Sequence, residues 1–361
     1  MIEEALTQTT DTRRWRRLLG GWKMTNERQG VGMNTSRRDF FRLGAASAAV
    51  AALSSVQGET TLQTTGVSLA SIGESLRFVL PSLKGRCRFM VVGDSHITVD
   101  DARGEPFSRY SKRMSRGYRS ALHFRTKRPI ASPDGFDFAL SEAVRLKVDF
   151  LALVGDIVSF PSEAGVEYVR RRLDESGLNW MYVAGNHDWH YEGLPGTEME
   201  LRDEWTRKRL APLYQGADPM MASRVVKGVR FVFIDNSLYE VLPEQVDFWK
   251  QESAKGDPVA LMMHIPLYMP GYGVQEAGCA HPEWSAKTDQ YWEIERRPRW
   301  PEKGHTEATL AFREAVLDTP NLLGIFVGHD HRQMIAVDRG RVQCATAANA
   351  DGSYLDVCVN S

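Results

Sequence analysis

The chain has 361 residues and a formal net charge of −1, with 42% hydrophobic and 25% charged residues. This length and composition are those of a folded globular protein with one large domain or two small ones. A net charge this close to zero gives no overall field that would favour nucleic acid or an anionic membrane as a partner. The four cysteines are scattered and show no CxxC spacing, which argues against a zinc-thiolate site and a disulfide-built scaffold.

Residues 33–60 resemble a twin-arginine export signal of the bacterial type. Arg37, Arg38 and Phe40 match an S-R-R-x-F pattern, and a small, weakly apolar run follows them. The run is shorter than the roughly 20 residues that a membrane-spanning helix needs. The segment therefore predicts the twin-arginine export machinery as a partner and a periplasmic or extracellular location in a bacterium. An Ala-rich helix after a basic region is the alternative.

Residues 1–32 precede this signal, and Met33 would be a natural start for it. The basic, aromatic stretch 12–23 could serve as a nucleic-acid- or membrane-binding arm, but we interpret residues 1–32 as a disordered or untranslated leader. Residues 1–60 are therefore set aside from the fold prediction. A linker or first strand is expected over 61–84, followed by the main folded domain over 85–361.

From residue 85 onward, apolar β-rich runs alternate with helix-like stretches at 136–148 and 163–177. Continuous apolar runs are typical of strands that are buried on both faces. Their alternation with helices predicts βαβ units and a largely parallel sheet. The predicted strands lie in the runs CRFMVVGDSH, VDFLALVGDI, NWMYVAGNHDWH, VRFVFIDNS, PVALMMHIP and LLGIFVGHDH.

Side chains that commonly bind metal ions follow five of these runs, and ligands bind at the carboxyl ends of strands in such sheets. The clusters supply Asp94 and His96; Asp156; Asn186, His187 and Asp188; His264; and His329 and His331. In extended backbone, His329 and His331 would point the same way, toward a common object. Two chance histidines in a surface turn are the alternative. The run that ends in Asp235 and Asn236 lacks histidine and is interpreted as a structural strand end.

The candidate ligands are carboxylates, imidazoles and one amide oxygen, a set that suits Mn²⁺, Fe or Zn²⁺. Seven ligands are too many for one ion. They predict two ions about 3.5–4 Å apart, bridged by one carboxylate. The candidate ligands are Asp94, His96, Asp156, Asn186, His264, His329 and His331.

The motifs GDSH, GD, GNHD, a lone His after a strand, and GHDH, in this order, resemble those of the calcineurin-like metallophosphoesterases. The resemblance covers roughly residues 85–361. It implies an α/β fold with four layers, α/β/β/α, and a dinuclear metal site at the carboxyl ends of the strands. It also implies a first metal held by Asp94, His96 and His331, a bridging Asp156, and a second metal held by Asn186, His264 and His329.

The resemblance further implies that His187 is a catalytic residue oriented by Asp188. For Asp188, a turn residue that bonds to its own backbone is the alternative. The implied activity is hydrolysis of phosphomonoester or phosphodiester bonds in a small phosphorylated substrate, with a hydroxide held between the two ions as nucleophile. A non-catalytic ligand-binding protein on the same fold is the alternative. Ser159 stands where purple acid phosphatases have a metal-binding Tyr, so an Fe(III)–tyrosinate site is not expected.

An insert at 266–305, rich in Trp, Tyr, Pro and charge, is predicted to pack over the site mouth. Candidate substrate-binding residues are Trp284 and Arg297 in this insert, and His190 and Tyr191 beside the catalytic pair. For Trp284, packing against the domain is the alternative.

Two further features of the sequence stay open. The basic segment 101–131 is either a solvated helix face or a wall that attracts an anionic substrate. In an exported protein, Cys344 and Cys358 could form a disulfide, because they lie in successive strand-like runs.

Overall fold

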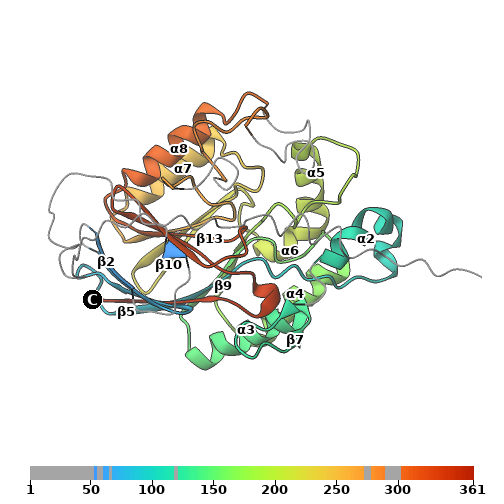
Figure 1. The fold of residues 1–361 in the computed structure, drawn as a ribbon, viewed down its shortest axis with the longest axis horizontal. Helices are drawn as coiled ribbons and strands as arrows, with labels where there is room; N and C mark the ends of the chain where they lie inside the picture. Colours follow the sequence, from blue (N-terminus) through green and yellow to red (C-terminus); the bar gives the residue numbers. More distant parts are fainter. Residues whose placement is uncertain (1–52, 55–59, 65–66, 118–120, 272–277, 289–301) are drawn as a thin grey trace, which may run out of the picture. The chain divides into compact units, whose positions relative to one another are not determined.

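The structure is a computed structural model that describes residues 53–54, 60–64, 67–117, 121–271, 278–288 and 302–361 (Figure 1). The leader 1–32 lies outside these ranges, and of the predicted signal only residues 53–54 and 60 lie inside them. Within the described ranges, every helix is too short or too polar to span a lipid bilayer.

The first of two seven-stranded sheets contains the strands that carry the first three polar clusters. In spatial order its strands are β2 (Thr60–Thr64), β3 (Val67–Ile72), β4 (Ser75–Val79), β16 (Leu355–Asn360), β5 (Arg86–Val92), β8 (Phe150–Val154) and β9 (Trp180–Val183). Strands β5, β8 and β9 are parallel, so their carboxyl ends meet at one edge. Strand β16 lies antiparallel beside β5, and β2 to β4 occupy most of the segment expected as a linker or first strand.

The second sheet carries the remaining clusters. In spatial order its strands are β1 (Leu53–Ser54), β14 (Met334–Asp338), β15 (Arg341–Ala345), β13 (Leu322–Val327), β12 (Val259–Met262), β11 (Val229–Ile234) and β10 (Met221–Val226). Strands β11, β12 and β13 are parallel. The sheet therefore gathers the carboxyl ends of β11, β12 and β13 at a common edge.

The two sheets pack face to face, and helices cover both outer faces (Figure 1). Between the sheets, Phe89 of β5 packs edge-to-face on Phe231 of β11 and Phe326 of β13, with ring centroids 5.0 and 5.2 Å apart. The helices on the first sheet include α3 (Ser132–Leu146) and α4 (Glu163–Ser176), and those on the second are α7 (Pro243–Ser253) and α8 (Glu307–Leu317). The predicted four-layer α/β/β/α fold is confirmed.

The apolar runs lack polar alternation because both faces of each strand are buried. On β5, Phe89 and Val91 point into the core between the sheets, whereas Met90 and Val92 pack under the helices. The helix predicted over 163–177 is α4, which begins after Ser162, whose side chain accepts a hydrogen bond from the Gly165 N–H. Helix α3 begins four residues earlier than predicted, at Ser132, with a proline in its first turn.

Candidate metal centre

The backbone turns sharply where the candidate ligands follow their strands. Left-handed φ angles occur at Asp94 (57°), His96 (46°), Asp156 (51°), His329 (74°) and His331 (56°). Such angles are uncommon outside glycine and cost about 1–3 kcal/mol each, so the surrounding structure must hold them. The extended-strand explanation for the paired histidines is therefore wrong. The chain has left β13 before His329, and the two histidines join different groups of ligands.

The first group joins Asp94, His96 and His331, from the ends of β5 and β13, with ligand atoms within 4.8 Å of one another. The Nε2 atoms of His96 and His331 lie 3.0 Å apart, and His331 Nε2 lies 3.3 Å from Asp94 Oδ1. Two imidazole lone pairs cannot face each other at this distance without a proton or a cation between them. Burial and the neighbouring His187 hold the pKa of His96 well below its usual value.

The second group joins Asp156, His264 and His329, from β8, β12 and β13, again with ligand atoms within 4.8 Å. Asp156 Oδ2 lies 3.2 Å from His264 Nε2 and 3.8 Å from His96 Nε2 of the first group. One carboxylate oxygen thus lies near both groups, where a ligand that bridges two ions would have to lie.

The tautomer of His264 is set by the backbone. Its Nδ1 lies 2.8 Å from the carbonyl oxygen of Val154, so Nδ1–H donates and Nε2 faces Asp156. Burial by itself lowers the pKa of His264. The nearby Asp156 carboxylate outweighs this effect and raises the pKa to about 10.

Asn186 and three glycines show that the site fits cations. The Oδ1 atom of Asn186 is buried and accepts no hydrogen bond from the described residues. A Cβ added at Gly155, Gly185 or Gly328, each directly before a candidate ligand, would come within 2.2–2.6 Å of His264 or an aspartate oxygen. The space around the ligands therefore depends on glycine at these positions. Oxygen and imidazole donors with an orphaned amide oxygen fit two divalent ions.

His187 lies beside the ligands rather than apart from them. Its ring packs at right angles to that of His96, with centroids 4.8 Å apart, and its backbone N–H donates to Asp156 Oδ1 at 2.8 Å. Asp156 therefore positions the backbone of His187 as well as facing both ligand groups.

Asp188 connects two ligand-bearing loops. Its Oδ1 accepts from the Val158 N–H and its Oδ2 from the Gly185 N–H, at 2.8 and 2.7 Å, and the residue is fully buried. Burial and the nearby Asp156 carboxylate raise the pKa of Asp188 to about 7. The bond from Gly185 agrees with the alternative of a turn residue that bonds to its own backbone. The bond from Val158 goes further, because it reaches the loop after β8.

The four candidate substrate residues lie in different surroundings. Tyr191 is a core residue, which corrects the prediction: it is 2% exposed, stacks on Phe107 and directs its hydroxyl to the Pro161 carbonyl. His190 is half-buried beside Trp189. Arg297 lies outside the described residues.

Trp284 is 5% exposed and stacks on His305, with ring centroids 4.6 Å apart. Because its ring face is taken up by His305, the packing alternative describes Trp284 better than substrate contact does.

The sequence prediction missed the support that the loop 235–240 gives to the second group. The side chain of Asn236 bonds to the turn after His264, and the hydroxyl of Tyr239 lies 2.8 Å from His329 Nε2. The available signal was the polar end of the run VRFVFIDNS, for which the sequence alone predicts only a structural strand end. Cys344 and Cys358 are buried and unbonded.

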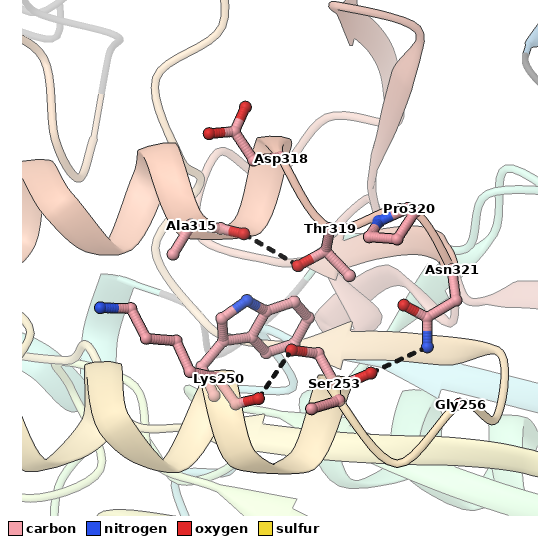
Figure 2. Close-up of a pocket in the computed structure, with 10 residues that line it drawn as sticks. Lys250, Ser253, Gly256, Ala315, Asp318, Thr319, Pro320 and Asn321 are labelled. Carbon is pink, nitrogen blue, oxygen red and sulfur yellow. Dashed lines mark hydrogen bonds between the residues drawn. The ribbon is translucent and has the colours of Figure 1, made fainter.

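A cavity of about 570 Å³ lies away from these ligands, between the carboxyl ends of α7 and α8 (Figure 2). Its wall includes Lys250, Ser253 and Asn321, and the Asn321 amide donates to the Ser253 carbonyl at 3.0 Å. Asn321 directly precedes β13, so the cavity lies at the opposite end of that strand from His329. It does not contain any of the candidate ligands.

A family model of calcineurin-like phosphoesterases matches residues 87–333. No curated protein sequence matches the chain. Solved structures with similarity include a dimetal phosphatase from Danio rerio, with 13% identity and a TM-score of 0.46 over 75% of this chain and 92% of that one. A purple acid phosphatase from Lupinus luteus has 13% identity and a TM-score of 0.42 over 80% and 48%. A 5'-nucleotidase from Candida albicans has 9% identity and a TM-score of 0.38 over 84% and 53%. Because the family model spans well over half of the sequence, the chain belongs to the calcineurin-like phosphoesterases.

Proposed function

We propose that this metal-dependent phosphoric ester hydrolase acts on small phosphomonoesters or phosphodiesters outside the cytoplasm, with two divalent ions. The observation that carries the proposal is the position of Asp156 Oδ2, 3.2 Å from His264 and 3.8 Å from His96. One carboxylate between two separate groups of ligands is an arrangement that suits a pair of neighbouring ions.

The proposed ligands of one ion are Asp94, His96 and His331; those of the other are Asn186, His264 and His329; Asp156 is shared. Mn²⁺, Fe or Zn²⁺ suits this set of oxygen and imidazole donors. Position 159, three residues after Asp156, is a serine rather than a tyrosine, so it offers no phenolate to an ion. This serine is buried, and its hydroxyl donates to the Met114 carbonyl at 3.4 Å. When bound, two such ions supply a nucleophile from water at neutral pH and neutralise charge on the phosphate.

His187 is the proposed proton donor to the leaving oxygen. Its ring lies beside that of His96, and its backbone is held by the Asp156 carboxylate. Asp188 ties the loop that carries His187 to the loop that carries Asp156, which keeps the donor at a fixed place beside the ligands. Positioned proton transfer of this kind contributes about 10²–10⁴-fold to rate.

The basic segment 101–131 supports the proposal that the substrate is an anion. Helix α2 (Ser108–Gly117) contains no acidic residue, and its Arg113 pairs with Glu192, five residues after His187, at 2.6 Å. The carbonyl of Met114 accepts a hydrogen bond from Ser159 in the loop after Asp156. A cationic helix is thus attached to two loops of the site, where it would raise the local concentration of an anion.

The proposal is tested with protein that has been stripped by a chelator and reloaded with Mn²⁺, Zn²⁺ or Fe²⁺. Nitrophenyl phosphate, bis(nitrophenyl) phosphate and pyrophosphate serve as substrates. We expect turnover that disappears on chelation and returns on reloading, with one bond class preferred. Protein that binds two ions yet turns over none of the three, while binding a phosphate ester tightly, would favour the alternative of a non-catalytic ligand-binding protein.

A further inference from the structure

The loop after β11, residues 235–240, contacts both histidines of the second ligand group. Asn236 Oδ1 accepts from the Ile265 N–H at 3.1 Å and from the His264 N–H at 3.3 Å, and its amide donates to the Ile265 carbonyl at 2.8 Å. Asn236 therefore shapes the turn that presents His264. Three residues later, the same loop reaches His329.

The contact with His329 is made by Tyr239. The tyrosine hydroxyl lies 2.8 Å from His329 Nε2, and the two rings are nearly perpendicular, with centroids 5.3 Å apart. Tyr239 is 4% exposed, so solvent does not compete strongly for this bond. A partner on one imidazole nitrogen decides which nitrogen carries the proton, and so which nitrogen can bind a cation.

The backbone of Tyr239 is held in an uncommon conformation. Its φ angle is 63°, in the left-handed region that bulky residues rarely adopt, and its N–H donates to the Asn236 carbonyl at 2.7 Å. Such strain persists where neighbouring contacts fix it, and it is often found at functional sites.

The next residue, Glu240, supplies those contacts. Its carboxylate accepts from the Thr306 N–H at 3.0 Å at the start of α8, and lies 2.8 Å from His305 Nδ1. His305 in turn stacks on Trp284. The end of the insert and the start of α8 therefore anchor the chain directly beside Tyr239.

We propose that Tyr239 is a positioning residue for the second metal ion. In this proposal His329 Nε2–H donates to the tyrosine oxygen, and Nδ1 of the same ring serves the ion. The inference rests on the proposed dinuclear function. If the Tyr239 hydroxyl only formed a hydrogen bond because it is buried, its removal would not change metal affinity. The experiment therefore compares metal affinity with and without this hydroxyl.

The test compares Tyr239→Phe with Tyr191→Phe, a second buried tyrosine whose hydroxyl contacts a backbone carbonyl. Mn²⁺ is titrated into chelator-stripped protein, and free Mn²⁺ is followed by electron paramagnetic resonance. For Tyr239→Phe we expect the second ion to bind about 10–100-fold more weakly and the first to bind as in the wild type. For Tyr191→Phe we expect both affinities to equal those of the wild type. Two unchanged affinities in Tyr239→Phe would overturn the proposal.

A second readout needs no ion. In stripped wild-type protein with ¹⁵N-labelled histidine, NMR should show His329 as the Nε2–H tautomer, and Tyr239→Phe should lose that preference. A wild-type Nδ1–H tautomer would overturn the assignment.

Failure of the proposed function has a different signature. Wild-type protein that took up fewer than two Mn²⁺ ions would overturn the dinuclear proposal, and the role of Tyr239 with it. Two ions bound equally well by the wild type and by Tyr239→Phe would overturn the role of Tyr239 alone.

Discussion

The Asp156 carboxylate lies 3.2 Å from His264 Nε2, and both side chains are buried at the ends of neighbouring layers of the fold. Asp156 follows β8 of one sheet and His264 follows β12 of the other. The pair therefore joins the two sheets at the edge where the candidate ligands meet.

Replacement of this carboxylate should remove both ions. Asp156→Ala deletes a carboxylate oxygen that lies near both ligand groups, so we expect elemental analysis to find less than one ion per chain after dialysis. Asp203→Asn, which changes an exposed carboxylate on α5 (Glu198–Trp205), is the control and should keep the wild-type metal content. Two ions retained in Asp156→Ala would contradict the bridging assignment.

Replacement of His187 should have the opposite effect. His187→Ala removes the proposed proton donor but none of the proposed ligands, so kcat should fall about 10²–10⁴-fold while metal content stays at two ions. Steady-state kinetics with elemental analysis of the same samples will check this. If the variant instead lost an ion, His187 would be a ligand, as its place beside His96 and Asp156 also allows.

Truncation of Trp284 should affect stability more than substrate choice. The ring is buried and stacked on His305, so Trp284→Ala should lower the free energy of unfolding by about 3 kcal/mol or more. Activity on a nitrophenyl ester and on a larger nucleotide ester should then fall alike, and Trp284→Phe should restore most of the stability. A selective rise in KM for the larger substrate, with an unchanged melting curve, would instead place Trp284 in the substrate site.

Glu142 should make stability depend on pH in the acid range. It accepts hydrogen bonds from Arg145 at 2.7 Å and from the Tyr354 hydroxyl at 2.9 Å, and mainly the Arg145 bond lowers its pKa to about 2. Because the folded-state pKa lies below the unfolded value, the stabilisation is complete above about pH 4.5 and is lost as the pH falls toward 2.

Glu142→Gln should therefore cost about 1–2 kcal/mol at pH 7, less than the pKa shift alone implies because solvent screens part of the interaction. Urea unfolding in the presence of a chelator should show this difference shrinking below about pH 4.5. Glu204→Gln removes an exposed pair with Lys208 and should change stability by less than about 1 kcal/mol at any pH. A Glu142→Gln penalty that persisted at low pH would point to packing rather than charge.

Export should depend on one pair of arginines. Changing Arg37 and Arg38 together to Lys keeps the charge but breaks the S-R-R-x-F pattern, so the protein should remain in the cytoplasm on fractionation of a bacterial host. The same change at Arg16 and Arg17 in the leader is the matched control and should leave export intact. Equal export of both variants would remove the support for a twin-arginine signal.

Residue types and their places after apolar runs were enough to indicate the kind of chemistry. Side-chain type indicates which residues can bind a metal ion, and the apolar run before each one indicates its place at the end of a strand. Asp156 and His264 could therefore be predicted as candidate ligands without coordinates. The strands β5, β8, β9, β12 and β13 were predictable for the same reason, since strands buried on both faces leave an uninterrupted apolar signature.

How these residues combine depends on the packing of distant parts of the chain. Strand β16 enters beside β5 from the far end of the chain, and no local pattern encodes that pairing. Asp188 proved to bond to backbone, Tyr191 proved to be core, and Tyr239 reaches His329 across 90 residues of sequence. Such roles depend on which distant segments come together when the two sheets pack face to face. They also depend on left-handed turns such as that at Tyr239. Periodicity and residue type predict neither of these features.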